Sequence, residues 1–122
     1  MKVLSLMPVE YDVLGKPQYD NLTLFLLEKV IELGATEIDF INKVNPKLFS
    51  RIANRDGSPY EIAGEIFEFI KQGGYDGILI DYTFPFDILL YLGYWLGTSL
   101  NERNELVIFI NKGYAIVERV EI

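Results

Sequence analysis

Short runs of apolar residues alternate along the chain with longer stretches in which apolar residues recur every three or four positions. The short runs are typical of buried strands, and the longer stretches are typical of helices that bury one face. We therefore predict alternating strands and helices. The predicted strands are residues 3–7, 36–41, 77–80, 106–110 and 114–122, and the predicted helices are residues 21–33, 46–54, 59–73 and 88–100.

Polar residues at the starts of the predicted helices support these boundaries. Asp20 or Asn21 can cap the first helix. Asn45 followed by Pro46 is typical of a cap with proline in the first turn. Ser58 begins a capping box with proline at the next position. Three helix starts therefore have local chemical support.

This order of elements predicts an α/β fold in one domain over residues 1–122. Strands that alternate with helices favour a three-layer sandwich with right-handed crossovers. We expect a flavodoxin- or Rossmann-like, mostly parallel sheet of about five strands with an antiparallel hairpin at its C-terminal edge. In such sheets ligands bind where loops leave the carboxyl ends of the strands. Those loops are expected at residues 8–12, 42–45 and 81–87.

The composition limits the chemistry. The chain has no Cys and no His, so thiolate nucleophiles, imidazole bases and most zinc sites are excluded, and proton transfer falls to Asp, Glu, Tyr or Lys. No Walker or G-x-G-x-x-G motif follows the first strand. We expect no metal and no other cofactor.

The composition also bears on partners and location. A formal charge of −7 opposes binding to nucleic acid or anionic lipid. We expect a small organic ligand, no nucleic acid, no membrane, a homo-oligomer, and a cytoplasmic protein with no secretory signal. Many Ile, Glu and Tyr residues, few Gln and no Cys are typical of a thermophile.

Carboxylates follow two of the predicted strands. Glu10 lies in the loop after the first strand, together with Met7, Pro8 and Tyr11, which are candidate ligand contacts. Asp81 ends the third strand, and Asp87 ends the loop that follows it. If these strands are neighbours, the three candidate catalytic carboxylates and that of Asp12 meet in one cleft, where repulsion can separate their pKa values into an acid and a base. The alternative is structural, with Asp81 in an Asx turn, Asp87 as a helix cap, and Glu10 and Asp12 solvated.

Aromatic residues are concentrated after the third predicted strand. Flat rings beside carboxylates suit a planar ligand such as a nucleobase. Rings spaced along a helix equally suit a core or a homodimer face, and Trp95 fits that role best. The aromatic residues in this segment are Tyr82, Phe84, Phe86, Tyr91, Tyr94 and Trp95.

Two arginines on the predicted short helix have two interpretations. Arg51 and Arg55 either reach a phosphate group or carry ordinary surface charge.

Three features together resemble the nucleoside 2-deoxyribosyltransferase-like proteins and related TIR-like nucleotide-binding domains. They are a first strand that ends in Met-Pro, a late strand that ends in Asp, and a following helix with Leu-Gly-Tyr. The resemblance covers the order of elements over most of the chain. The residues that carry it are Met7, Pro8, Asp81, Leu92, Gly93 and Tyr94.

The resemblance implies carboxylate chemistry on an N-glycosidic bond. It implies that Asp81 positions the sugar and that a Glu just before Leu-Gly-Tyr attacks the anomeric carbon, with no metal. In this chain Tyr91 stands in place of that Glu, and residues 101–104 replace the family's Gly-Lys-Pro. Three hypotheses follow: an enzyme in which Asp87 or Glu10 has taken over, a nucleoside or nucleotide sensor without turnover, or a homo-oligomerising module.

Overall fold

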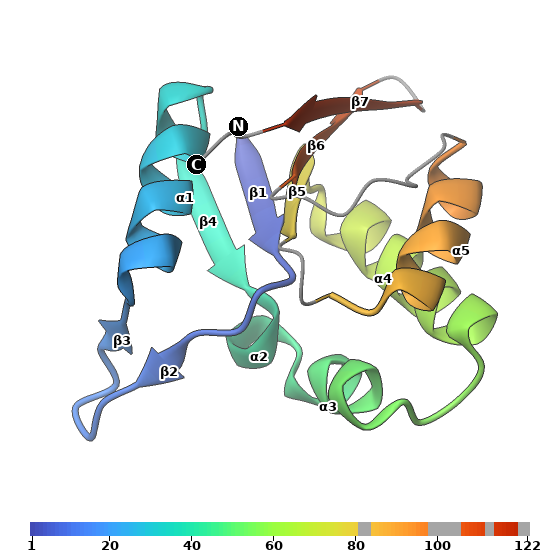
Figure 1. Ribbon diagram of the computed structural model, residues 1–122, viewed down its shortest axis with the longest axis horizontal. Coiled ribbons are helices and arrows are strands. Elements are labelled where there is room, and N and C mark those ends of the chain that lie inside the picture. The colour runs from blue at the N-terminus through green and yellow to red at the C-terminus, as the bar shows by residue number, and fades with distance from the viewer. Residues whose placement is uncertain (81–83, 98–105, 112–113, 120–122) are drawn as a thin grey trace.

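The computed structural model describes the backbone of residues 1–80, 84–97, 106–111 and 114–119, and the side chains of residues 1–80 and 84–97 (Figure 1). Its elements, in chain order, are β1 (Lys2–Ser5), β2 (Glu10–Tyr11), β3 (Pro17–Gln18), α1 (Asn21–Glu32), β4 (Glu37–Phe40), α2 (Ile41–Val44), α3 (Pro46–Asn54), α4 (Pro59–Gly73), β5 (Gly77–Ile80), α5 (Phe86–Leu96), β6 (Leu106–Asn111) and β7 (Tyr114–Arg119).

Three parallel strands form the part of the sheet that positions the candidate site. β1 pairs with β4 on one side and with β5 on the other, with Leu4 opposite Asp39 and Ile78. β6 runs antiparallel to β5, and β7 runs antiparallel to β6, so the strand order is β4-β1-β5-β6-β7. The predicted α/β class, with a parallel sheet and helices, is confirmed.

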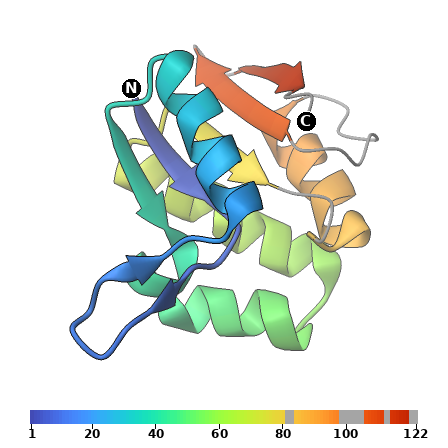
Figure 2. The same cartoon turned by 60° about the vertical axis from the view of Figure 1, so that its left-hand side comes forward.

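Helices cover both faces of the parallel strands (Figures 1 and 2). Successive side chains of a strand point to opposite faces. Val3 accordingly packs with Leu26 of α1, whereas Leu4 packs in the cluster that includes α4 and α5. Each such fully buried aliphatic side chain contributes about 1.5–3 kcal/mol through the hydrophobic effect.

The predicted helix caps at three starts are confirmed. Asp20 accepts a hydrogen bond from the backbone N–H of Thr23 at 2.7 Å, and Ser58 accepts one from Glu61 at 3.1 Å. The side chain of Asn45 caps α3 in the same way, with Pro46 in the first turn.

Other local predictions were wrong at particular residues. α5 begins at Phe86 with Pro85 as its N-cap, so Asp87 lies inside the first turn and does not cap the helix. The helix ends at Leu96 because Gly97 adopts a left-handed conformation (φ 77°). The hairpin of β2 and β3 and the single turn of α2 were not predicted, since segments of two to four residues show no periodicity.

A buried tyrosine links two strands across β1. The hydroxyl of Tyr75, just before β5, donates a hydrogen bond of 2.7 Å to the carboxylate of Asp39 in β4. The ammonium group of Lys2 lies 4.5 Å from the centroid of the Tyr75 ring. Burial of the hydroxyl, and then its bond to Asp39, raise the pKa of Tyr75 well above the usual value.

Tyr75→Phe tests this link. Removing the hydroxyl leaves Asp39 without its donor, so we expect the free energy of unfolding at pH 7 to fall by about 1–3 kcal/mol. Because the pKa is raised in the folded state, the Tyr75 contribution is fully present below about pH 10, the pKa of an unfolded tyrosine, and is lost as the pH rises above it. Urea unfolding at pH 7 and pH 10.5 should therefore show a smaller difference between variant and wild type at the higher pH.

Tyr94→Phe is the matched control, because the Tyr94 side chain is largely exposed. It should unfold like the wild type at both pH values. A Tyr75→Phe variant whose deficit is the same at pH 7 and pH 10.5 would contradict the assigned role of the hydroxyl.

Candidate functional site

The chain leaves β1 at the point where the strand order changes direction. In the sheet, β1 lies between β4 and β5, which are the next two parallel strands along the chain. The N–H of Leu6 still bonds to the carbonyl of Leu79 at 2.8 Å, and the buried Ser5 hydroxyl donates to the carbonyl of Met7 at 3.1 Å. Doubly wound sheets bind ligands at such a switch point, outside the carboxyl ends of the strands.

Asn42 joins the loop after β1 to the chain after β4. Its side-chain amide donates to the carbonyl of Val9 at 2.6 Å, and its side-chain oxygen accepts from the N–H of Val9 at 3.2 Å. Asn42 lies in α2, directly after the end of β4. The two predicted ligand loops, residues 8–12 and 42–45, are therefore held together by a pair of hydrogen bonds.

The β2–β3 hairpin extends from this loop and ends next to α1 (Figure 2). Glu10 pairs with Gln18 across the hairpin. The carboxylate of Asp12 accepts the N–H groups of Leu14 and Lys16, each at 2.9 Å, and fixes the turn. Asp12 therefore has a structural role, as a turn-forming acid commonly does.

A cavity of about 700 Å³ lies between the first loop, the hairpin, the start of α1, α2 and α3. This size is typical of sites for small organic ligands. Aromatic rings and uncharged amides line it together with two carboxylates, and its described lining contains no Lys or Arg. The lining residues are Pro8, Val9, Glu10, Gln18, Tyr19, Asp20, Thr23, Asn42 and Phe49.

The charges around this cavity are set by local hydrogen bonds. The backbone N–H of Thr23, and then its hydroxyl, lower the pKa of Asp20 below the usual value. Asp20 is therefore an anion at neutral pH, and it already accepts a backbone N–H at the N-terminus of α1, that of Thr23. Beside the cavity, burial and then the neighbouring Tyr19 and Asp39 raise the pKa of Tyr11, which stays protonated.

The predicted ligand contacts of the first loop separate into two groups. Pro8 and Glu10 line the cavity. Met7 does not, because it is buried against α1 in the cluster of Val3 and Leu26. Tyr11 packs next to Val9 under the ammonium group of Lys43, 5.1 Å from its ring centroid, and is not part of the lining.

The predicted residues on α5 lie around a different cavity. Asp87, Tyr91 and Tyr94, with Tyr60 and Leu90, line a space of about 540 Å³ that shares no lining residue with the first cavity. The structure therefore does not bring Glu10 and Asp87 into one described cavity. Phe84 is buried in the core, and Phe86 packs against it. Asp81 and Tyr82 lie outside the described residues.

Arg51 in α3 and Arg55, the residue that ends this helix, each form an ion pair. Arg55, which has a left-handed backbone (φ 54°), pairs with Asp87 of α5. Arg51 Nε lies 2.8 Å from Glu65 Oε2 of α4. Neither arginine lines the 700 Å³ cavity. Trp95 is partly buried against the core, with its ring 5.7 Å from that of Phe67 and its N–H bonded to the carbonyl of Tyr60.

Of the residues that line the cavity, sequence reasoning named Pro8 and Glu10 as site residues and missed the other seven, which are Val9, Gln18, Tyr19, Asp20, Thr23, Asn42 and Phe49. Asn42 could have been identified from the sequence, because it begins a loop that was predicted to lie at the ligand-binding edge of the sheet. Tyr19 packs on Phe40 with 6.0 Å between ring centroids, a contact that only the folded chain creates.

Compared with protein-family models, curated proteins and solved structures, the chain has no match in any of the three. Within the part of the chain that the structure describes, no helix has the length and apolar character needed to cross a membrane. The same residues contain no group of three or more acidic side chains placed to hold a metal ion.

Asn42→Ala tests whether this side chain holds the two loops together. It leaves the N–H and carbonyl groups of Val9 without their partners, so we expect a loss of about 1–3 kcal/mol in the free energy of unfolding. The local effect is more specific: amide hydrogen exchange of Val9 should become at least tenfold faster, while that of Leu79 changes only with global stability. Unchanged protection of Val9 would contradict this role.

Proposed function

We propose that this domain binds a small planar ligand with hydroxyl groups, a nucleoside, in the 700 Å³ cavity at the carboxyl edge of β1. The observation that carries the proposal is the lining of that cavity, in which the rings of Tyr19 and Phe49 lie near the carboxylates of Glu10 and Asp20. Aromatic faces bind planar bases, and carboxylates accept hydrogen bonds from sugar hydroxyls.

The charges favour an uncharged nucleoside over a nucleotide. Phosphate groups often bind at helix N-termini, where free N–H groups point at the anion. At α1 this place is already taken by the Asp20 carboxylate. A phosphate in the cavity would meet Asp20 and Glu10 with no Lys or Arg among the described lining residues to balance them.

The fold supports the same proposal. We infer a complete flavodoxin-like, three-layer sandwich with a five-stranded sheet and an antiparallel C-terminal hairpin, in a cytoplasmic protein. The strand order β4-β1-β5 and the helices on both faces of these strands support the inferred fold. The resemblance to the nucleoside 2-deoxyribosyltransferase-like proteins agrees in ligand class, and it rests on the residues named from the sequence.

Hydrolysis or transfer at the N-glycosidic bond is a second candidate, which the exposed carboxylate of Glu10 in the cavity favours. In hydrolysis Glu10 accepts a proton from water, the water oxygen bonds to the anomeric carbon, and the base leaves with the electrons of the C–N bond and takes up a proton. Asp81 would position the sugar, as the resemblance implies.

The predicted alternative, a homo-oligomerising module, has separate support. Leu90, Tyr91 and Tyr94 on α5 are 45, 43 and 69% exposed, although all three are large and mostly apolar. Adjacent exposed apolar side chains of this size are typical of interaction sites.

Ligand binding is tested by thermal unfolding with adenosine and thymidine as probes. A ligand that binds only the native state stabilises it by about 2.7 kcal/mol at a concentration of 100 times Kd, so we expect Tm to rise by several degrees. The corresponding 5′-monophosphates should give a smaller rise or none. A rise in Tm only with the monophosphates would contradict the proposed charge preference.

Glu10→Gln should reduce the nucleoside-dependent rise in Tm, because the amide loses one acceptor and the negative charge. Glu28→Gln is the matched control, since Glu28 is exposed on α1 and does not line the cavity. Equal effects of the two substitutions, or no rise in Tm with any nucleoside, would contradict binding at this cavity.

Turnover is tested by the release of free base from the same nucleosides. If the domain is an enzyme, Glu10→Gln should lower the rate of base release by about 10²–10⁴-fold, the usual contribution of general acid–base catalysis. Stable binding without base release from the wild type would select the sensor.

A further inference from the structure

Glu10 and Gln18 reach the 700 Å³ cavity from the same face of the β2–β3 hairpin. The two residues are paired directly across its antiparallel strands, and both line the cavity. Side chains that are directly opposite in an antiparallel pair point to the same face, with their Cβ atoms about 4.5–5.5 Å apart. An amide therefore lies beside the candidate catalytic carboxylate at this wall of the cavity.

The turn of the hairpin fixes the orientation of the Gln18 amide. The amide nitrogen Nε2 donates to Oδ2 of Asp12 at 3.3 Å and to the carbonyl oxygen of Lys16 at 3.5 Å. An ionised carboxylate only accepts hydrogen bonds, so the nitrogen of the amide, and not its oxygen, must face Asp12. The oxygen Oε1 is left for a ligand, since none of the described residues donates a hydrogen bond to it.

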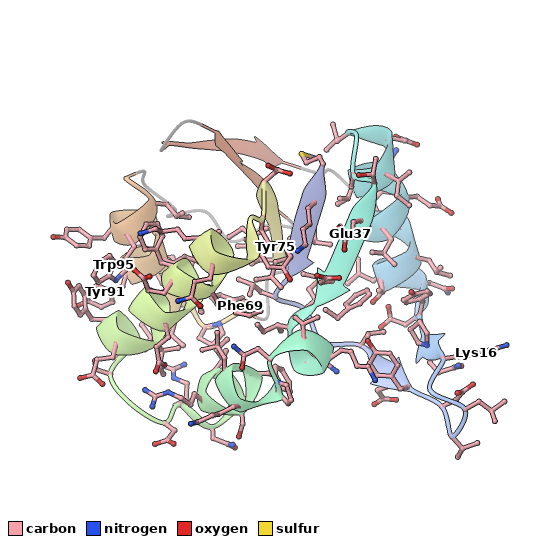
Figure 3. All side chains as sticks on the ribbon, turned by 180° about the vertical axis from the view of Figure 1, so that it is seen from behind. Lys16, Glu37, Phe69, Tyr75, Tyr91 and Trp95 are labelled. Atoms are coloured by element: carbon pink, nitrogen blue, oxygen red, sulfur yellow. The ribbon has the colours of Figure 1, made fainter. Side chains whose placement is uncertain are left out.

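Asp12 uses one oxygen for the turn and the other for Gln18. Oδ1 accepts the N–H groups of Leu14 and Lys16, each at 2.9 Å, whereas Oδ2 accepts from the Gln18 amide. The hairpin projects from the body of the molecule, where Lys16 marks it in Figure 3. A change at Oδ2 therefore leaves both hydrogen bonds of Oδ1 in place and does not reach the core.

The side chains of the described lining mainly offer acceptors. Glu10 and Asp20 contribute carboxylates, and Gln18 contributes its amide oxygen. The side-chain donors on the lining are the hydroxyls of Tyr19 and Thr23 and the amides of Asn42 and Gln18, and both amides already donate to other groups of the chain. A ligand in this cavity is therefore bound best through hydrogen-bond donors of its own.

Gln18 is the amide that is left to contact the edge of a base. In the proposed site the carboxylates accept from the sugar hydroxyls. Asn42 is bonded to the backbone of Val9 through both its oxygen and its nitrogen. The Gln18 oxygen is an uncharged acceptor without a partner among the described residues, and an exocyclic amino group of a base is a donor that fits it.

We propose that the cavity selects nucleosides whose base carries an exocyclic amino group, and that Oε1 of Gln18 accepts the hydrogen bond from that group. Adenine and cytosine have an amino group where hypoxanthine and uracil have a carbonyl oxygen. A carbonyl oxygen would face the Gln18 oxygen without a proton between them, which disfavours binding. Asp12 is a positioning residue, because it acts by orienting the amide. This inference rests on the proposed nucleoside site and names the bases that the site prefers.

The first experiment measures Kd of the full chain for adenosine, inosine, cytidine and uridine by titration of backbone amide chemical shifts. We expect adenosine to bind about three- to tenfold more tightly than inosine, and cytidine to exceed uridine by a similar factor, as one net hydrogen bond gives. All four should shift the amides of Glu10 and Gln18. Equal Kd values within both pairs would overturn the selection and leave the nucleoside site standing, whereas no saturable shift with any of the four would overturn both.

Gln18→Met tests the acceptor itself, because Met has a similar length and lacks the amide. The preference for adenosine over inosine should disappear. Gln72→Met is the matched control, since Gln72 is exposed on α4 and does not line the cavity, and it should keep the preference of the wild type. A Gln18→Met variant that retains the full preference would contradict the role of Gln18.

Asp12→Asn tests the positioning role with Gln18 unchanged. The substitution keeps Oδ1 for the turn and places an amide nitrogen where Oδ2 stood. This nitrogen donates, so the Gln18 amide should turn its oxygen toward it and present Nε2 to the cavity. We expect the preference for adenosine to be lost or reversed, with circular dichroism like that of the wild type. A purely structural role would weaken adenosine and inosine equally, and an unaltered ratio of their Kd values would overturn the positioning role.

Discussion

The central position of β1 is the constraint on which the rest of the described structure depends. Its backbone pairs with β4 on one side and with β5 on the other, and Val3 and Leu4 are fully buried on its two faces. When both edges and both faces of a strand are covered, the chain can reach the surface only at the ends of that strand. The chain after Ser5 must therefore leave at the carboxyl edge of the sheet, together with the chain after β4.

The cavity follows from how that edge is closed. The Asn42 side chain makes the two hydrogen bonds to the backbone of Val9 that a neighbouring strand would otherwise make. Asp12 stabilises the turn that brings the hairpin back to the start of α1. Asp20 then serves both the helix and the cavity, because its carboxylate caps α1 while it lines the space. The same groups that satisfy the backbone thus give the cavity its acidic, hydrogen-bonding character, which suits a hydroxylated and uncharged ligand.

The sequence predicted what local chemistry determines. The α/β class follows from apolar runs, and the caps at Asp20 and Ser58 act within three residues of themselves, so both were predictable. The cavity was not, because Asn42 bonds to Val9, 33 residues away. The position of Asp87 was not predictable either, because its partner Arg55 lies 32 residues away. Contacts at that separation leave no periodic signal, so Asp87 was grouped with Glu10 although the fold places it beside the tyrosines of α5.

The most direct measurement is the change in backbone amide chemical shifts during titration with adenosine or thymidine. Binding at the carboxyl edge of β1 predicts saturable changes at Val9, Glu10, Gln18 and Asn42, with the amides of Tyr91 and Tyr94 unaffected. Saturable changes confined to α5, or none at millimolar nucleoside, would contradict the assignment of the ligand site.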